Sequence, residues 1–377
     1  MRVLVVDDSA FMRRAISQMI ASEPGLEVID TARNGREAVE KALALKPDVI
    51  TLDVEMPEMN GLDALREIRR VCPDPKPAVI MCSSLTSAGS HEALRALRLG
   101  AAEVVAKQAS IQTGNLDVLR TDLITKIKAL GNPGSRLANR LLPPVNTPGP
   151  HQPSAALAAL NAKPAAPIAR GTDAGFVLPA RNYELLVIGS STGGPPVLET
   201  ILTRLAPEIR VPVVVAQHMP AMFTKSLAER LNDLCAANVV HADREMELLP
   251  GTIYILKGEN HGHIQKSARL GGPLRVTIGP EPQAALYRPS VDVLFQTAAK
   301  ATGGRCAGVV LTGMGEDGGP GSVEVTKAGG LVIAQSERSC VVYGMPKAVV
   351  ERGAAAAALD PADIPGALTT LWTRSAA

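Results

Sequence analysis

A turn of small residues around Ser191 has the composition of a reactive junction between a strand and a helix. Residues 185–188 are apolar, and the small residues 189–194 follow them directly. A helical pattern then covers 195–205, with apolar side chains on one face. Small residues let the backbone turn sharply, and the first N–H groups of the helix point at whatever occupies the turn. The Ser191 hydroxyl could attack a carbonyl there while these N–H groups receive the negative oxygen.

Such a turn does not establish a nucleophile by itself, because glycine-rich turns also bind phosphates or simply reverse the chain. A nucleophilic serine needs a base and an acid. His218 directly follows a predicted buried strand and is the candidate base, with a capped or core histidine as the alternative. Glu316 and Asp317 lie in a glycine-rich loop after another strand, where either could orient the imidazole or cap a helix.

Three other interpretations of the turn are disfavoured by order and spacing. Gly189-x-Ser191-x-Gly193 matches the nucleophile elbow of α/β-hydrolases, but that fold places the acid before the histidine, and here His218 comes first. A dinucleotide site needs Gly-x-Gly-x-x-Gly and an acid at the end of the next strand, and both are missing. A Walker loop needs Gly-Lys-Ser/Thr, which does not follow.

A second group of reactive side chains follows predicted strands in the N-terminal third of the chain. Asp7 and Asp8 follow the first strand, Asp53 the third, Ser83 the fourth and Lys107 the fifth. Clustered carboxylates repel one another unless a cation lies among them, and Mg²⁺ prefers such oxygen ligands. Each residue alone has a commoner structural role. Together they supply the nucleophile, metal ligands, hydroxyl and ammonium that accept and hold a phosphoryl group.

The apolar pattern predicts the elements that position both groups. Five strand and helix units in the first part predict a doubly wound α/β domain, whose functional residues gather at the carboxyl ends of parallel strands. The strands expected there are 3–6, 26–29, 49–52, 78–81 and 103–106, and a last helix is expected over 115–130. A second α/β domain is expected to contain strands 185–188, 211–217, 252–257, 274–278, 307–311 and 331–334, with antiparallel hairpin material between 251 and 279. Its expected helices are 195–205, 222–234, 291–302, 317–328 and 347–352.

Composition divides the chain into residues 1–130, 131–180 and 181–377. In the middle part proline and alanine dominate and no apolar periodicity survives, which predicts a flexible linker. A chain of 377 residues is long enough for two domains, each with its own core.

The bulk charge and the cysteines restrict the possible partners. Lys plus Arg number 39 and Asp plus Glu 37, so the charge of +2 gives no reason to expect a nucleic acid or membrane partner. Without a basic recognition helix, a transcription regulator is disfavoured. Five scattered cysteines with no Cys-x-x-Cys pair argue for a reducing cytosol. Because the first apolar run is too short for a signal peptide and no run approaches a membrane span, we expect a soluble, cytoplasmic monomer.

The N-terminal motifs resemble the response-regulator receiver family. The matching segments are residues 5–9, 52–62, 83–84 and Lys107. Receivers usually have a proline after this lysine, whereas Gln108 stands here. The resemblance implies that a histidine kinase phosphorylates Asp53. It assigns the Mg²⁺ site to Asp7, Asp8, Asp53 and the Glu55 backbone, and phosphoryl sensing to Ser83 and Lys107.

The C-terminal motifs, following a receiver, are similar to the chemotaxis protein-glutamate methylesterase/glutamine deamidase family of the CheB type. The matching segments are residues 188–194, 217–220, 287–292, 311–318 and 343–346. The resemblance implies an α/β methylesterase domain with a parallel sheet. It assigns the catalytic triad to Ser191, His218 and Asp317, and so selects Asp317 over Glu316. The oxyanion is expected on backbone N–H groups near Thr192, Gly193 and Met314.

The implied reaction is hydrolysis of glutamate γ-methyl esters on methyl-accepting chemotaxis receptors, with deamidation of glutamine as a second activity. Mg²⁺ is expected in the receiver domain and no cofactor in the esterase. His261 and His263 lack a third ligand and are interpreted as surface residues. The unphosphorylated receiver is expected to block substrate access until Asp53 is phosphorylated. The alternative is a receiver-regulated binding module without catalysis, and Ser191→Ala separates the two hypotheses.

Overall fold

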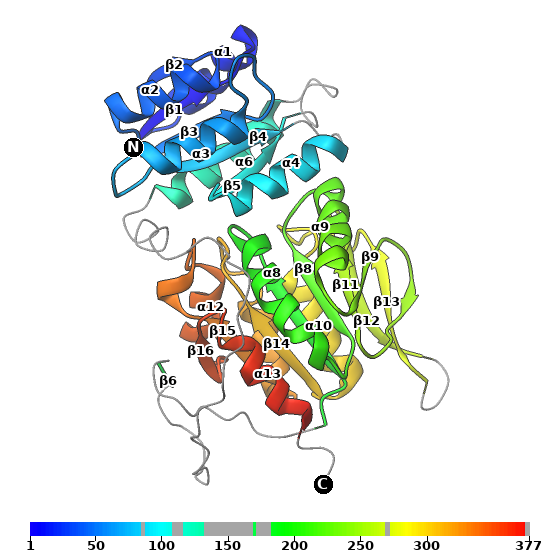
Figure 1. The fold of residues 1–377 in the computed structure, drawn as a ribbon. Coiled ribbons are helices and arrows are strands. Elements are labelled where there is room, and N and C mark those ends of the chain that lie inside the picture. Colours follow the sequence, from blue (N-terminus) through cyan, green and yellow to red (C-terminus); the bar gives the residue numbers. More distant parts are fainter. Residues whose placement is uncertain (84–86, 108–115, 132–168, 171–181, 268–271, 374–377) are drawn as a thin grey trace, which may run out of the picture. The chain divides into compact units, whose positions relative to one another are not determined.

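The computed structural model describes residues 1–83, 87–107, 116–131, 169–170, 182–267 and 272–373 (Figure 1). Gln108 and nearly all of the predicted linker lie outside these residues. The chain separates into two compact units, Met1–Leu142 and Pro143–Ala377. None of the described helices is both long enough and apolar enough to cross a bilayer.

The first unit contains a five-stranded parallel sheet in the order β2-β1-β3-β4-β5. Its strands are β1 (Arg2–Val6), β2 (Glu27–Ala32), β3 (Val49–Asp53), β4 (Ala78–Ser83) and β5 (Glu103–Ala106). Its helices are α1 (Ala10–Ala21), α2 (Gly35–Leu45), α3 (Gly61–Val71), α4 (Ser87–Arg98) and α6 (Leu116–Leu130). The predicted doubly wound fold is confirmed. Strands β1 and β3 flank the point where the strand order reverses, which is where such folds bind ligands.

The start of α3 lies very close to the end of β3. The Asn60 side chain accepts a hydrogen bond from the Asp63 N–H (2.9 Å) and so caps the helix. A Cβ atom at Gly61 would lie 2.0 Å from the Asp53 carbonyl oxygen, so only glycine permits this approach. The local sequence therefore holds Asp53 in a short loop between a buried strand and a capped helix.

The second unit contains an eight-stranded parallel sheet in the order β6-β16-β15-β14-β7-β8-β11-β9. Its strands are β6 (Ala169–Arg170), β7 (Leu185–Ser190), β8 (Val213–Gln217), β9 (Asn238–Ala242), β11 (Thr252–Leu256), β14 (Cys306–Val310), β15 (Leu331–Gln335) and β16 (Ala357–Leu359). Its helices are α8 (Gly194–Leu205), α9 (Ala221–Leu234), α10 (Val291–Thr302), α11 (Gly319–Lys327), α12 (Met345–Glu351) and α13 (Ile364–Thr373), with short 3-10 turns at Ala206–Glu208 and Glu337–Ser339. The predicted parallel sheet is confirmed.

The sequence did not predict every element of this unit. The predicted hairpin material contains β12 (His261–Lys266) and β13 (Leu274–Gly279), which pair in a separate antiparallel sheet. This sheet also contains β10 (Met246–Glu247), which was not expected. Strands β9 and β16 and helix α13 were not expected. Strand β6 lies within the segment predicted as a linker and pairs with β16.

Strand β7 lies at the topological switch point of this sheet. The chain builds β8, β11 and β9 on one side of β7 and then returns to add β14, β15 and β16 on the other side. Helix α10 begins directly against β7, since a Cβ at Gly189 would lie 2.2 Å from the Val291 Cγ1 atom. The carboxyl ends of β7, β8 and β14 therefore meet the start of α10.

Candidate functional site

The three N-terminal acids predicted as metal ligands lie together in the first unit. One carboxylate oxygen from each of Asp7, Asp8 and Asp53 lies within 4.8 Å of the others, with Asp7 and Asp53 buried and Asp8 exposed. The Lys107 Nζ atom lies 2.7 Å from Asp7 Oδ2 and 2.5 Å from Asp53 Oδ1. A cluster of three carboxylates with the Lys107 ammonium among them therefore lies at the topological switch point between β1 and β3. Three converging carboxylates form an oxygen donor set that fits Mg²⁺.

Burial controls the ionisation of this cluster. It raises the pKa of Asp53 to about 6, against the opposing effect of Lys107. Burial also opposes the charge of Lys107, but Asp53 and the other neighbours raise the pKa of its ammonium overall. Asp53 is therefore mostly ionised at neutral pH.

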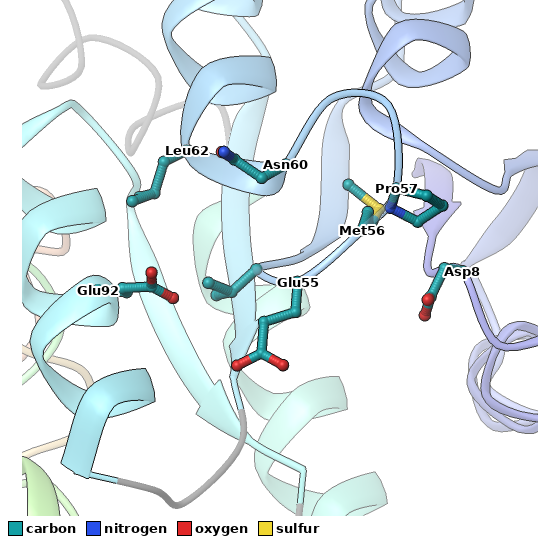
Figure 2. Close-up of a pocket in the computed structure, with 8 residues that line it drawn as sticks. Asp8, Glu55, Met56, Pro57, Asn60, Leu62 and Glu92 are labelled. Atoms are coloured by element: carbon teal, nitrogen blue, oxygen red, sulfur yellow. The ribbon is translucent and has the colours of Figure 1, made fainter.

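Ser83 and Glu55 lie near the same cluster, but their side chains have different surroundings. The Lys107 N–H donates to the Ser83 carbonyl (2.8 Å), so the two residues are neighbours. The Ser83 hydroxyl donates to the Gly89 carbonyl (3.0 Å) in helix α4. Glu55 is exposed and lines a cavity of about 570 Å³ together with Asp8 and Glu92. Figure 2 shows the carboxylates of Glu55 and Glu92 approaching this space from the loop after β3 and from α4. Sequence reasoning missed Glu92, because a single acid on a helix carries no signal.

The sheet register of the second unit brings Ser191 beside His218. Ser190 of β7 and Gln217 of β8 are register partners at the ends of adjacent strands, so Ser191 and His218 are the first residues after them. The His218 N–H donates to the Ser190 carbonyl (3.0 Å). The Ser191 N–H donates to the Thr312 carbonyl (3.0 Å) after β14. Three segments far apart in sequence thus converge at one edge of the sheet.

His218 is bonded to Asp317 through one ring nitrogen. The distance from His218 Nε2 to Asp317 Oδ2 is 2.8 Å. A carboxylate can only accept, so Nε2 carries the hydrogen and Nδ1 carries the lone pair. Nδ1 is buried and, within the described part of the chain, has no hydrogen-bond partner. The imidazole is therefore held in the tautomer that can accept a proton at Nδ1.

Asp317 is bound by several donors besides His218. It accepts hydrogen bonds from the Ser290 hydroxyl (3.0 Å), the Val291 N–H (2.7 Å) and the Asp292 N–H (2.9 Å). Burial alone would raise the pKa of the Asp317 carboxyl, but the bonds from His218 and the backbone hold it below its usual value. The acid therefore stays ionised next to the imidazole.

The other acid of the loop lies elsewhere. Glu316 is exposed, and its Oε2 atom accepts a hydrogen bond from Arg352 Nη2 (2.6 Å). Helix α11 was expected from residue 317 but begins at Gly319, so Asp317 precedes it. The geometry therefore favours Asp317 over Glu316 as the partner of the histidine.

Thr192, Gly193 and Met314, the predicted pocket residues, lie in the two segments next to Ser191. Thr192 is buried, and its carbonyl accepts a hydrogen bond from the Thr312 hydroxyl (3.0 Å). Gly193 precedes helix α8 with a φ of 76°, which favours glycine. Met314 is half-buried in the loop before Asp317. The start of α8 and this loop therefore border the Ser191 turn from two sides.

Two side chains that support the site were not singled out from the sequence. Gln217 Nε2 donates to the Ser191 carbonyl (3.0 Å), and its Oε1 accepts from the Ser190 hydroxyl (2.5 Å). The Tyr287 ring stacks on the His218 ring, with centroids 4.4 Å apart and planes 9° apart. Gln217 could have been found from the sequence, because it is a polar residue at the end of a predicted buried strand. Nothing in the sequence beyond its motif indicated a role for Tyr287.

The expectation that His261 lies on the surface is wrong. His261 is fully buried, and its Nδ1 atom accepts a hydrogen bond from the Ser290 N–H (3.1 Å). His263 Nε2 lies 2.9 Å from the Glu281 carbonyl oxygen. One ring nitrogen of each histidine is therefore engaged with the backbone, and His261 supports the residue that donates to Asp317.

Gly313→Ala should displace the Ser191 side chain directly. A Cβ atom at this position would lie 2.7 Å from the Ser191 Cβ and 2.2 Å from the Met345 sulfur. Because misplacement by about 1 Å can cost roughly 10²-fold in rate, we expect a loss of that order in ester hydrolysis, measured as product release. Gly279→Ala is the matched control, since a Cβ there meets nothing within 4 Å. Equal rates for the two variants would contradict the crowding argument.

The chain matches two families along its length. Residues 3–116 match the response regulator receiver domain, and residues 186–368 match the CheB methylesterase family. A relative from Oleidesulfovibrio alaskensis, named protein-glutamate methylesterase/protein-glutamine glutaminase 1, is 42% identical over 97% of this chain and 98% of its own. A relative from Archaeoglobus fulgidus, named protein-glutamate methylesterase/protein-glutamine glutaminase, is 41% identical over 94% of this chain and 93% of its own. The crystal structure of the Thermotoga maritima CheB methylesterase catalytic domain is 39% identical, covers 50% of this chain and 98% of that chain, and gives a TM-score of 0.48.

The fold and the two family matches define a response regulator whose receiver domain is joined to a methylesterase domain with a parallel α/β sheet. The chain belongs to the family of protein-glutamate methylesterases/protein-glutamine glutaminases. The resemblance stated from the sequence motifs is therefore confirmed.

Proposed function

We propose that this chain removes methyl groups from glutamate esters of methyl-accepting chemotaxis receptors and deamidates glutamine to glutamate. The family membership and the full-length similarity to proteins named for these two activities support the reaction class. The observation that carries the proposal is the Nε2 bond from His218 to Asp317, because it leaves a basic nitrogen at the sheet edge that also holds Ser191. Sensory adaptation is the biological output that follows from this reaction.

The proposed mechanism assigns one role to each member of the triad. His218 Nδ1 takes the proton from the Ser191 hydroxyl as its oxygen attacks the ester carbonyl, and Asp317 stabilises the resulting imidazolium. The imidazolium returns the proton to the departing methoxide, which leaves as methanol. Water, activated by the same histidine, then hydrolyses the acyl-serine ester and releases the free glutamate.

The proposed oxyanion site uses backbone donors. We assign it to the N–H groups of Thr192 and Gly193 at the start of α8, together with Met314. The free N–H groups and the positive end of the helix dipole favour negative charge at such a position. The left-handed backbone of Gly193 and the burial of Thr192 support a fixed geometry there.

The receiver site is proposed to control this reaction. We assign phosphorylation to Asp53, Mg²⁺ binding to Asp7, Asp8, Asp53 and the Glu55 backbone, and sensing to Ser83 and Lys107. A bound Mg²⁺ would neutralise phosphoryl charge during transfer. The cluster of three carboxylates around Lys107 supports this assignment. Because the proposed phosphoryl donor is a chemotaxis histidine kinase, a cytoplasmic location is part of the proposal.

The proposed domain organisation is a receiver at 1–130, a linker at 131–180 and a catalytic domain at 181–377. The composition of the middle segment and the two matched families support it. Phosphorylation is proposed to shift the chain toward a state in which receptor glutamates reach Ser191.

Asp53→Asn should abolish regulation without abolishing catalysis. Methanol release from methylated receptor membranes is measured with and without Mg²⁺ and a small-molecule phosphodonor. The donor is expected to raise the rate of the unmodified chain roughly 5- to 150-fold, the usual range of coupling between sites, and to leave the Asp53→Asn rate unchanged. Asp63→Asn, which changes an exposed acid of the same unit, is the control. Equal stimulation of Asp53→Asn would rule out this phosphorylation site.

A further inference from the structure

The N-termini of helices α10 and α11 are capped reciprocally, each by a carboxylate from the other segment. Asp317 precedes α11, yet it accepts hydrogen bonds from the first N–H groups of α10, those of Val291 (2.7 Å) and Asp292 (2.9 Å). Asp292 lies in the first turn of α10, and its Oδ1 atom accepts from the N–H groups of Gly318 (3.0 Å) and Gly321 (2.6 Å) at the start of α11. Each carboxylate therefore caps the helix to which the other belongs.

The two helix starts are locked at a short separation. A Cβ atom at Gly321 would lie 2.9 Å from the Asp292 Cα and 2.8 Å from the Phe295 Cβ. Phe295 is fully buried in the core of the unit. Neither helix start can move without breaking the hydrogen bonds of Asp292 or opening this contact. The backbone directly after Asp317 is thus held by a side chain from a different helix.

We propose that Asp292 is a positioning residue, which holds the loop that carries Asp317 at the distance that orients His218 for ester hydrolysis. The inference rests on the proposed function. Asp292 does not bond to His218; it acts through the Gly318 N–H, one residue from the acid. Because Asp317 already accepts bonds from His218, Ser290 and two backbone groups, a small shift of this loop changes several bonds at once.

The negative charge of Asp292 is disfavoured at this position, so the effect of the charge can be separated from the effect of its hydrogen bonds. Burial is the largest cause that raises the pKa of Asp292 to about 6; the neighbouring Asp317 acts in the same direction, and the Gly321 and Gly318 N–H groups oppose the shift. The Asp317 carboxylate is bonded to His218, and it also acts electrostatically on Tyr287 and the buried His261. A neutral amide could accept the same two N–H bonds without this repulsion. Capping, rather than negative charge, is therefore the property that the site requires.

The test compares Asp292→Ala, Asp292→Ser and Asp292→Asn in the full chain. Alanine removes both hydrogen bonds, and serine is too short to reach both N–H groups. We expect kcat for methanol release from methylated receptor membranes to fall about 10²-fold in both, with KM nearly unchanged, because orientation and not substrate binding is lost. Asparagine should restore kcat close to that of the unmodified chain.

Two controls separate positioning from general stability. Asn232→Ala removes another side-chain acceptor of a backbone N–H, that of Val239 (3.0 Å), at the far end of α9. It should lower the unfolding temperature without lowering kcat. Nitrogen NMR of the His218 ring reports the tautomer without any receptor substrate. We expect the Nε2–H form in the unmodified chain and in Asp292→Asn, and a mixture of tautomers in Asp292→Ala and Asp292→Ser.

The possible outcomes decide between the two proposals. The positioning role is overturned if Asp292→Ala keeps the kcat of the unmodified chain, or if its His218 ring stays in the Nε2–H form alone. It is also overturned if Asp292→Asn loses as much kcat as Asp292→Ala. A loss in Asn232→Ala equal to that in Asp292→Ala would also overturn it. If the unmodified chain releases no methanol, the proposed function fails, while the NMR comparison still tests whether Asp292 orients His218. Should alanine prevent folding, the serine variant supplies the same comparison.

Discussion

Ser191→Ala is expected to reduce methanol release from methylated receptors roughly a millionfold, which is the order of loss seen when a triad loses its nucleophile. The reason is that the variant lacks the hydroxyl that the proposed mechanism places beside His218. The Ser190 hydroxyl, one residue away, is buried and already donates to Gln217. His218 would keep its bond to Asp317 in the variant, but it would have no alcohol from which to take a proton.

The measurement that checks this expectation is single-turnover methanol release by the full chain, with Ser190→Ala as the matched control. Ser190→Ala removes a hydroxyl of the same size from the same turn and should cost far less activity. Binding to receptor membranes should survive in Ser191→Ala, because the lost group is small and buried. Retention of full hydrolysis would exclude Ser191 as the nucleophile. An unmodified chain that binds receptors without hydrolysis would instead favour the non-catalytic binding module.

The positions of the site residues along the strands could be predicted because strand ends are strong signals. Apolar runs predicted the end of β8 at Gln217 correctly, and they ended the strand before Ser191 at Ile188, two residues short of the end of β7 at Ser190. The parallel pairing of β7 and β8 makes Ser191 and His218 neighbours. The same reasoning placed the N-terminal acids beside Lys107. The identity of the acid could not be predicted in this way. Pattern and spacing left Glu316 and Asp317 open, and the family resemblance selected between them.

The supporting contacts could not be predicted, because they depend on how helices pack. The stretch 317–328 fits a helical pattern, and in such a pattern an acid at the first position is usually a cap of its own helix. In the structure Asp317 instead caps α10, because Gly189 and Gly321 let that helix approach β7 and α11. No periodicity encodes such an approach. The unpredicted strand β16 is short and alanine-rich, so its strand propensity is weak.

Asp317→Asn is the sharpest test of the assigned tautomer. In the unmodified chain Oδ2 accepts from His218 Nε2 and the Val291 N–H, and Oδ1 accepts from the Ser290 hydroxyl and the Asp292 N–H. An amide has one oxygen and one NH₂ group, and we expect the oxygen to take the Oδ1 position, where the Ser290 hydroxyl and the Asp292 N–H both donate. The NH₂ group would then donate to Nε2, which moves the imidazole hydrogen to Nδ1. His218 would lose the lone pair that accepts the Ser191 proton.

We therefore expect Asp317→Asn to lower kcat about 10⁴-fold while leaving the fold and KM nearly unchanged, since the geometry is kept and the tautomer is wrong. The control is Glu316→Gln, one residue earlier, whose carboxylate is exposed and paired with Arg352. It should retain the full rate. An asparagine variant within tenfold of the unmodified chain would mean that His218 does not need this acid, and an equal loss in Glu316→Gln would mean that the acid was assigned to the wrong residue.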